Sequence, residues 1–248
     1  MQRTARRQTW IERWGGVVEN PTAVRRALLL LHGLALGAQD LLFPPYCAGC
    51  ERVGSLLCPR CMAAITRPAP RAIPGLAEVC VCAEYDGAIG AAIRALKYGG
   101  QTRLAEPLGT LLARSLYRSG WSIDLIVPVP LHPARLRDRG YNQAKLVSLY
   151  ASRALAIPVS SSAVWRVRDT PSQVDLNARE RRANMKGAFE SDAEIVRGRS
   201  VLVVDDVLTT GATIGACAEA LRLAGAARVF GATVAGAVLS PEPAAGCG

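Results

Sequence analysis

Apolar runs alternate with amphipathic stretches from residue 78 onward. Short runs rich in β-branched residues predict strands, and longer stretches with apolar residues every three or four positions predict helices. The predicted strands cover 78–85, 123–129, 159–167, 200–204 and 227–238. The predicted helices cover 90–98, 104–118, 142–155 and 211–224, whereas the polar stretch 177–186 is either helix or loop. This order indicates an α/β fold with a mostly parallel sheet, in which ligands bind at the carboxyl ends of the strands.

An earlier apolar stretch, 27–38, follows Arg25 and Arg26 and is interrupted only by His32. It is shorter than the ~20 residues that span a bilayer. A signal-peptide core is the alternative, but it would stand unusually far from Met1. We therefore expect an amphipathic helix that leads into Leu41–Pro45. We also expect the protein to be cytoplasmic.

Four cysteines form two C-x-x-C pairs within fifteen residues, and they are Cys47, Cys50, Cys58 and Cys61. Each pair lets two thiolates converge on one metal, so the spacing predicts a tetrahedral zinc site. A small segment with little hydrophobic core of its own needs a metal site of this kind for stability. A closed all-thiolate site does not activate water, so the zinc should be structural. Cys80 and Cys82 are interpreted as strand residues, although they could contribute to a second site.

The predicted strand 200–204 is followed by two carboxylates and a Thr-rich loop that opens a helix. Backbone N–H groups at a helix N-terminus, helped by threonine hydroxyls, can hold a phosphate, and glycine allows its close approach. Carboxylates accept hydrogen bonds from vicinal hydroxyls, so the pattern predicts a ribose 5-phosphate clamp. An acidic helix cap and a metal site on the two carboxylates are the alternatives. The candidate residues are Asp205, Asp206, Thr209, Thr210, Gly211, Ala212 and Thr213.

Composition narrows the class of protein and its partners. The chain has 248 residues, half of them hydrophobic, and a net charge of +10, which excludes a disordered chain and favours an anionic partner. Its 8 cysteines are too few for a disulfide scaffold. The segment 131–186 holds much of the positive excess, and 1–26 holds a smaller share. The four tryptophans are not interleaved with basic residues, as a nucleic-acid stacking platform would require.

Residues 201–213 resemble the phosphoribosyl pyrophosphate (PRPP) loop of type I phosphoribosyltransferases. Further segments resemble the ComF/GntX family of competence protein F-like proteins, from about Leu28 to Val238. They are Phe43–Cys47, Leu96–Tyr98, Val127–Arg135, Arg139–Ala144, Thr170–Gln173 and Arg182–Phe189. The resemblance implies a parallel-sheet type I phosphoribosyltransferase fold with a small amino-terminal four-cysteine zinc ribbon. The ribbon is shortened here, because only Cys80 and Cys82 follow Cys61 within the amino-terminal cysteine cluster, 47–82.

The resemblance also implies roles for individual residues. Asp205 and Asp206 would hold the ribose 2- and 3-hydroxyls, and Thr209–Thr213 would hold the 5-phosphate. The pyrophosphate side would comprise Pro130, His132, Arg135 and Arg139, with Mg²⁺ bridging the pyrophosphate. Gln173 and Arg182 would contact the ligand from a mobile loop, 166–186. Structural roles are the alternatives to ligand contact for several of these residues. They are a turn role for His132, a helix-end charge for Lys97, and capping roles for Arg139, Asn142 and Gln143.

The expected activity is displacement of pyrophosphate at the ribose anomeric carbon by an acceptor that the sequence does not identify. The alternative is a non-catalytic PRPP sensor, or an accessory protein of competence associated with single-stranded DNA or the competence machinery. A homodimer is possible by the same resemblance. The expected organisation is a basic flexible leader (1–26), a leading helix plus zinc ribbon (27–78), a phosphoribosyltransferase-like domain (79–240) and a tail (241–248).

Overall fold

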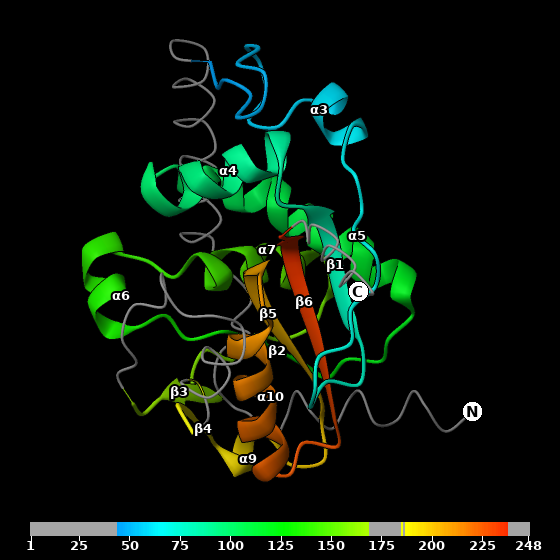
Figure 1. Cartoon of the computed structure of the whole chain (residues 1–248), viewed down its shortest axis with the longest axis vertical. Coiled ribbons are helices and arrows are strands. Elements are labelled where there is room, and N and C mark those ends of the chain that lie inside the picture. The colour runs from blue at the N-terminus through cyan, green and yellow to red at the C-terminus, as the bar shows by residue number, and fades with distance from the viewer. Residues whose placement is uncertain (1–43, 169–184, 186, 238–248) are drawn as a thin grey trace, which may run out of the picture. The chain divides into compact units, whose positions relative to one another are not determined.

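The computed structural model describes residues 44–168, 185 and 187–237. The predicted leader, the helix 27–38, the tail, Gln173 and Arg182 lie outside these residues. The four cysteines and the α/β body belong to one compact unit that begins at Tyr46 (Figure 1). Among the described residues, no helix is long and apolar enough to cross a membrane.

The described helices and strands follow one another in the order expected of an α/β fold. They are α3 (Pro59–Ala63), β1 (Val79–Glu84), α4 (Gly87–Tyr98), the 3-10 turn η1 (Thr102–Leu104), α5 (Ala105–Ser119), β2 (Leu125–Pro128), α6 (Pro133–Arg139), α7 (Gln143–Leu155), β3 (Val164–Arg166), β4 (Phe189–Ser191), α9 (Ala193–Val196), β5 (Ser200–Leu208), α10 (Ala212–Leu223) and β6 (Arg228–Gly236).

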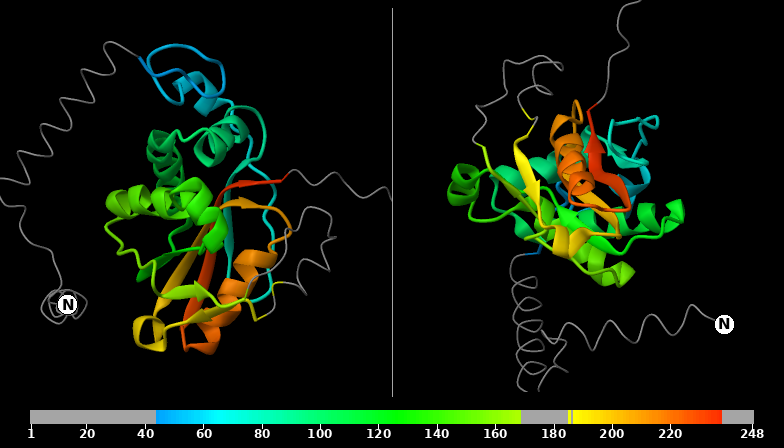
Figure 2. Two further views of the ribbon diagram at one scale, coloured as in Figure 1. Left: turned by 90° about the vertical axis from the view of Figure 1, so that its left-hand side faces the viewer. Right: turned by 90° about the horizontal axis from the view of Figure 1, so that it is seen from below.

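Four strands form a parallel sheet in the order β1-β6-β5-β2, which confirms the predicted architecture. Along β5, Val201 and Val203 pack on one face, and Leu202 and Val204 pack on the other. Because both faces are covered, the strand reads as a continuous apolar run. Helices α5 and α7 cover one face and α10 the other, as the left view of Figure 2 shows.

Two predicted strands differ from the structure. The stretch 159–167 is divided: Val159 makes a single parallel bridge to Ile126, and only β3 continues, paired antiparallel with β4 in a separate small sheet. Between them, the Ser160 hydroxyl accepts a hydrogen bond from Ala163 N (3.1 Å) and turns the chain. The strand predicted over 200–204 runs on to Leu208, so the acid pair lies inside β5 and not after it.

Helices α6 and α9 were not predicted. Pro133 occupies the first turn of α6, and the His132 Nδ1 atom caps it by accepting a hydrogen bond from Ala134 N (3.1 Å). None of the residues of α6 is buried, so the helix has no apolar face for periodicity to reveal. Two of the predicted pyrophosphate-side residues, Arg135 and Arg139, therefore lie on a helix.

Candidate functional site

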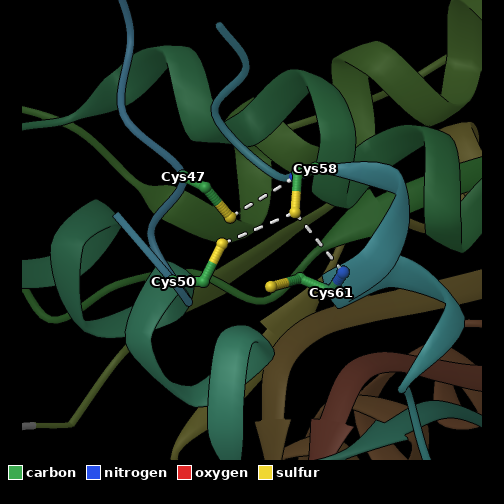
Figure 3. Close-up of side chains that lie close together, drawn as sticks. All are labelled: Cys47, Cys50, Cys58 and Cys61. Atoms are coloured by element: carbon green, nitrogen blue, oxygen red, sulfur yellow. Dashed lines mark hydrogen bonds between the residues drawn. The ribbon is translucent and has the colours of Figure 1, made fainter. Parts of the chain in front are cut away.

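The cysteine pairs converge as their spacing predicts (Figure 3). The four Sγ atoms all lie within 4.8 Å of one another, and those of Cys50 and Cys58 are 3.6 Å apart. A tetrahedral zinc ion with Zn–S bonds of ~2.3 Å needs sulfurs about 3.8 Å apart. Cys58 also caps α3, because its Sγ atom accepts from Cys61 N at 3.5 Å. These four residues could therefore hold zinc.

We name the four converging cysteines, Cys47, Cys50, Cys58 and Cys61, the cysteine knuckle. Its electrostatics favour a bound cation. Burial opposes ionisation of Cys47, but backbone N–H groups of Cys58, Gly49 and Cys50 lower the pKa of its thiol to about 6. The neighbouring sulfurs of Cys58 and Cys50 raise the pKa of Cys61 to about 12. Four thiolates so close together repel one another, and a dication would offset this repulsion.

The acid pair lies at the carboxyl edge of the sheet. β2 pairs with β5 only as far as Val204, whereas β6 continues alongside β5 to Leu208. A regular strand would place neighbouring side chains on opposite faces. Here the alternation is interrupted, because Val204 and Val207 both pack on the α5 side and Leu208 packs on the α10 side. Asp205 and Asp206 therefore occupy an irregular stretch beside an unpaired strand edge.

Asp206 is held by a lysine from another element. The Lys97 Nζ atom, in the last turn of α4, lies 2.9 Å from Asp206 Oδ2, and the two side chains are 18% and 6% exposed. Burial alone would lower the pKa of Lys97, but the attraction of Asp206, and then of Asp205, raises it above its ordinary value. The ammonium therefore stays charged and neutralises one of the two carboxylates.

Asp205 is the carboxyl that titrates near neutral pH. Burial, followed by repulsion from Asp206, raises the pKa of Asp205 from 3.8 to about 7. Its Oδ1 atom accepts a hydrogen bond from the Asp206 backbone N–H at 2.9 Å. A half-buried carboxyl with such a pKa can both accept and donate a proton or a hydrogen bond at pH 7.

The Thr-rich loop joins β5 to α10. Gly211 is the N-cap of α10 and has a left-handed backbone (φ +76°), and a Cβ at this position would lie 2.4 Å from Ile73 Cδ1. The Thr210 hydroxyl accepts a hydrogen bond from Ala212 N at 3.3 Å. The other N–H groups of the first turn have no partner in the helix itself, so this end is able to bind an anion.

The pyrophosphate-side candidates sit across the edge, after β2. Arg135 is exposed on α6, and the His132 ring caps that helix. The Arg139 guanidinium donates to Gln143 Oε1 and lies 5.4 Å from the centre of the Tyr98 ring. Asn142 caps α7 through Lys145 N and donates to Val129 O at 2.9 Å. These contacts join the segment after β2 to the end of α4.

Two residues near the Thr-rich loop and the acid pair come from distant segments. The sequence placed Lys97 in a segment of the family resemblance and left it equally a helix-end charge, whereas its ion pair with Asp206 is a finding of the structure. Arg71 carried no sequence signal, yet its guanidinium donates to Thr209 O in the Thr-rich loop at 3.1 Å. For Lys97 the signal was the family segment Leu96–Tyr98, whereas nothing in the sequence links Arg71 to residues 201–213.

Known proteins resemble this chain both in the carboxyl-terminal half and over most of its length. A phosphoribosyl transferase domain matches residues 135–243. The DNA utilization protein YhgH of Escherichia coli K12 is 34% identical over 194 residues, which cover 74% of this chain and 85% of that protein. Competence protein F of Haemophilus influenzae is 32% identical over 203 residues, covering 78% and 86%.

Among solved structures, a PRPP amidotransferase from B. subtilis, complexed with ADP and GMP, matches 52% of this chain and 26% of its own at 21% identity, with a TM-score of 0.37. The identity and coverage of the two curated relatives settle the family. The chain belongs to the competence protein F family, and its α/β body is a phosphoribosyltransferase-type domain.

Proposed function

We propose that the chain binds PRPP at the carboxyl edge of the sheet and transfers its phosphoribosyl group to an acceptor. The observation that carries the proposal is the continuous unit of strand β5, acid pair, Thr-rich loop and helix α10. In it, Asp205 and Asp206 would bind the ribose hydroxyls, and residues 209–213 would bind the 5-phosphate through backbone N–H groups.

The Lys97 ion pair favours ribose over a metal ion at the acid pair. With Asp206 neutralised and Asp205 titrating near pH 7, the pair carries at most about one negative charge. A pair of low net charge is better suited to accept hydrogen bonds from hydroxyls than to bind a dication.

The chemistry assigned to the chain is mainly positioning and stabilisation of charge. The C–O bond between the anomeric carbon and pyrophosphate breaks, a bond to the acceptor forms, and the electron pair leaves with pyrophosphate. Mg²⁺, bound with PRPP, would neutralise the leaving group. On the protein, Arg135 and Arg139 lie after β2, where they could face the pyrophosphate, since arginine grips such oxygens bidentately.

A binding experiment separates the enzyme from the sensor. Isothermal titration with PRPP and Mg²⁺ should show binding that Asp205→Asn/Asp206→Asn removes. Pyrophosphate release is then measured with candidate bases and amines. Binding together with release supports the transferase, and binding without release supports a PRPP sensor. If PRPP does not bind the wild-type protein, the whole proposal fails.

A second candidate function, binding of single-stranded DNA, is favoured by one surface. The Tyr98 ring is 78% exposed, and the Arg139 guanidinium lies over it at 5.4 Å from the ring centre. Arg135 and Arg137 extend the positive charge along α6. Aromatic rings and arginines of this kind bind stacked bases and phosphates without sequence preference. The printed names of the relatives, DNA utilization protein and competence protein F, agree with such a role.

The tyrosine gives this candidate a direct test. Tyr98→Ala should weaken salt-sensitive binding of a single-stranded oligonucleotide, whereas Tyr117→Ala, an 81% exposed tyrosine on α5, should leave it unchanged. Oligonucleotide binding that survives Asp205→Asn/Asp206→Asn would separate it from PRPP binding. Equal affinity of the two tyrosine variants would exclude this surface.

A further inference from the structure

The segment between α3 and β1 lies against the Thr-rich loop. We name residues 66–76 the strap. Near its start, Thr66 O accepts a hydrogen bond from Glu84 N at 2.8 Å, and just beyond its end Ala77 N donates to Val229 O at 2.7 Å. It therefore begins beside the carboxyl end of β1 and finishes beside the start of β6 (Figure 1). Both ends of the strap are thus fixed to the sheet.

Arg71 is the point at which the strap reaches the loop. One guanidinium nitrogen donates to Thr209 O at 3.1 Å, and the other donates to Ala237 O, directly after β6. Ala237 N in turn donates to Leu208 O at 2.8 Å. The Arg71 guanidinium thus links the residue after β5, Thr209, to the residue after β6, Ala237. It also fixes the direction of the Thr209 carbonyl, the first of the loop.

Ile73 completes the contact from the apolar side. Its side chain occupies the space that a Cβ on Gly211 would fill, and it lies beside Gly215, one turn further along α10. The loop is therefore held by one hydrogen bond from Arg71, whose other nitrogen is fixed by Ala237 O, and by the packing of Ile73 against Gly211. This matters for a ligand because N–H groups that hold a phosphate must be preorganised in direction.

We propose that Arg71 is a positioning residue of the ligand site: it sets the conformation of the Thr209–Thr213 loop and thereby the affinity for a sugar 5-phosphate. The inference rests on the proposed function. Arg71 acts through the loop carbonyl, and its charge is already engaged by two carbonyl oxygens. Its effect should therefore be the same for every ligand that presents a 5-phosphate, with or without pyrophosphate.

The test compares Arg71→Met with Arg222→Met, a matched loss of an exposed arginine on α10. Titration calorimetry uses ribose 5-phosphate and PRPP with Mg²⁺. Arg71→Met should weaken both by the same factor, about tenfold, which corresponds to roughly one lost hydrogen bond to a charged group. Arg222→Met should bind both like wild type. Circular dichroism confirms that each variant is folded at the temperature of the titration.

Arg71→Lys keeps the charge but replaces the planar fork, so it should recover only part of the affinity. It also decides the question if Arg71→Met does not fold. Wild-type affinity in Arg71→Met, or in Arg71→Lys where Arg71→Met is unfolded, overturns the inference, as does a loss confined to PRPP. If the wild-type protein binds neither ligand, the proposed function fails instead, and the two failures are thereby distinguished.

Discussion

The ion pair between Lys97 and Asp206 gives the sharpest prediction for stability. At 2.9 Å the two charges attract by about 6 kcal/mol at an effective dielectric constant of ~20. The net value is smaller, because both groups lost hydration on folding. Removing one partner of a buried pair typically costs about 3–5 kcal/mol, and the lower end applies here because Lys97 is 18% exposed.

The perturbation is Lys97→Met, which removes the charge and keeps most of the chain length. A loss of ~3 kcal/mol lowers the midpoint of thermal unfolding by roughly 6–12 °C in a chain of this size. The control is Lys145→Met, which removes an exposed lysine from α7. Both are measured by circular dichroism and by urea denaturation at pH 7.5.

A second substitution tests the cause of the loss. If an unpaired buried carboxylate destabilises Lys97→Met, then adding Asp206→Asn should restore part of the stability, because the neutral amide costs less to bury. Equal unfolding midpoints for Lys97→Met and Lys145→Met would refute the reasoning. So would a double variant that is less stable than Lys97→Met alone.

Three further predictions concern pH, the loop and the metal. Folding raises the pKa of Asp205 from 3.8 to about 7, so the folded protein keeps a proton that the unfolded chain releases. The contribution of Asp205 to the free energy of unfolding is therefore greatest below pH 3.8 and is lost as the pH rises through about 7. In urea denaturation, Asp205→Asn should gain stability relative to wild type between pH 5 and pH 8. Gly211→Ala should lose about 1–3 kcal/mol and bind ribose 5-phosphate weakly, whereas Gly198→Ala, with a similar φ (+71°) in open space, should lose stability but not affinity. Elemental analysis should find about one zinc ion per chain, absent from Cys58→Ser, and chelation should lower the thermal midpoint; a metal-free wild-type protein would contradict the site.

Features set by short spacings were predictable from the sequence. Two C-x-x-C pairs can bring four thiolates together almost regardless of the surrounding fold, and the Sγ atoms do converge. A buried run followed by Thr-Thr-Gly predicts a strand, a loop and a helix, which are β5, the loop and α10. In each case the local sequence contains all the groups that determine the local structure.

Features that depend on tertiary contacts were not predictable. The charge of Lys97 at the end of α4 is explained equally well by the helix dipole, and only the tertiary structure, which brings it to Asp206, reveals its partner. Arg71 lies in a segment without periodicity, 138 positions before the carbonyl that it contacts. Helix α6 escaped prediction for the opposite reason, because it packs none of its residues into the core.

The place of the cysteine knuckle in the fold suggests how it could act without performing chemistry. A Cβ on Gly49, between Cys47 and Cys50, would lie 2.3 Å from Ala88 Cβ, so the knuckle abuts the first turn of α4. Lys97, in the last turn of α4, pairs with Asp206, and the chain from Cys61 continues into the strap and Arg71. Both segments that steady the proposed site therefore begin at the knuckle. Because a closed thiolate site offers no open position to a substrate, we expect any influence of zinc on ligand binding to act through α4 and the strap.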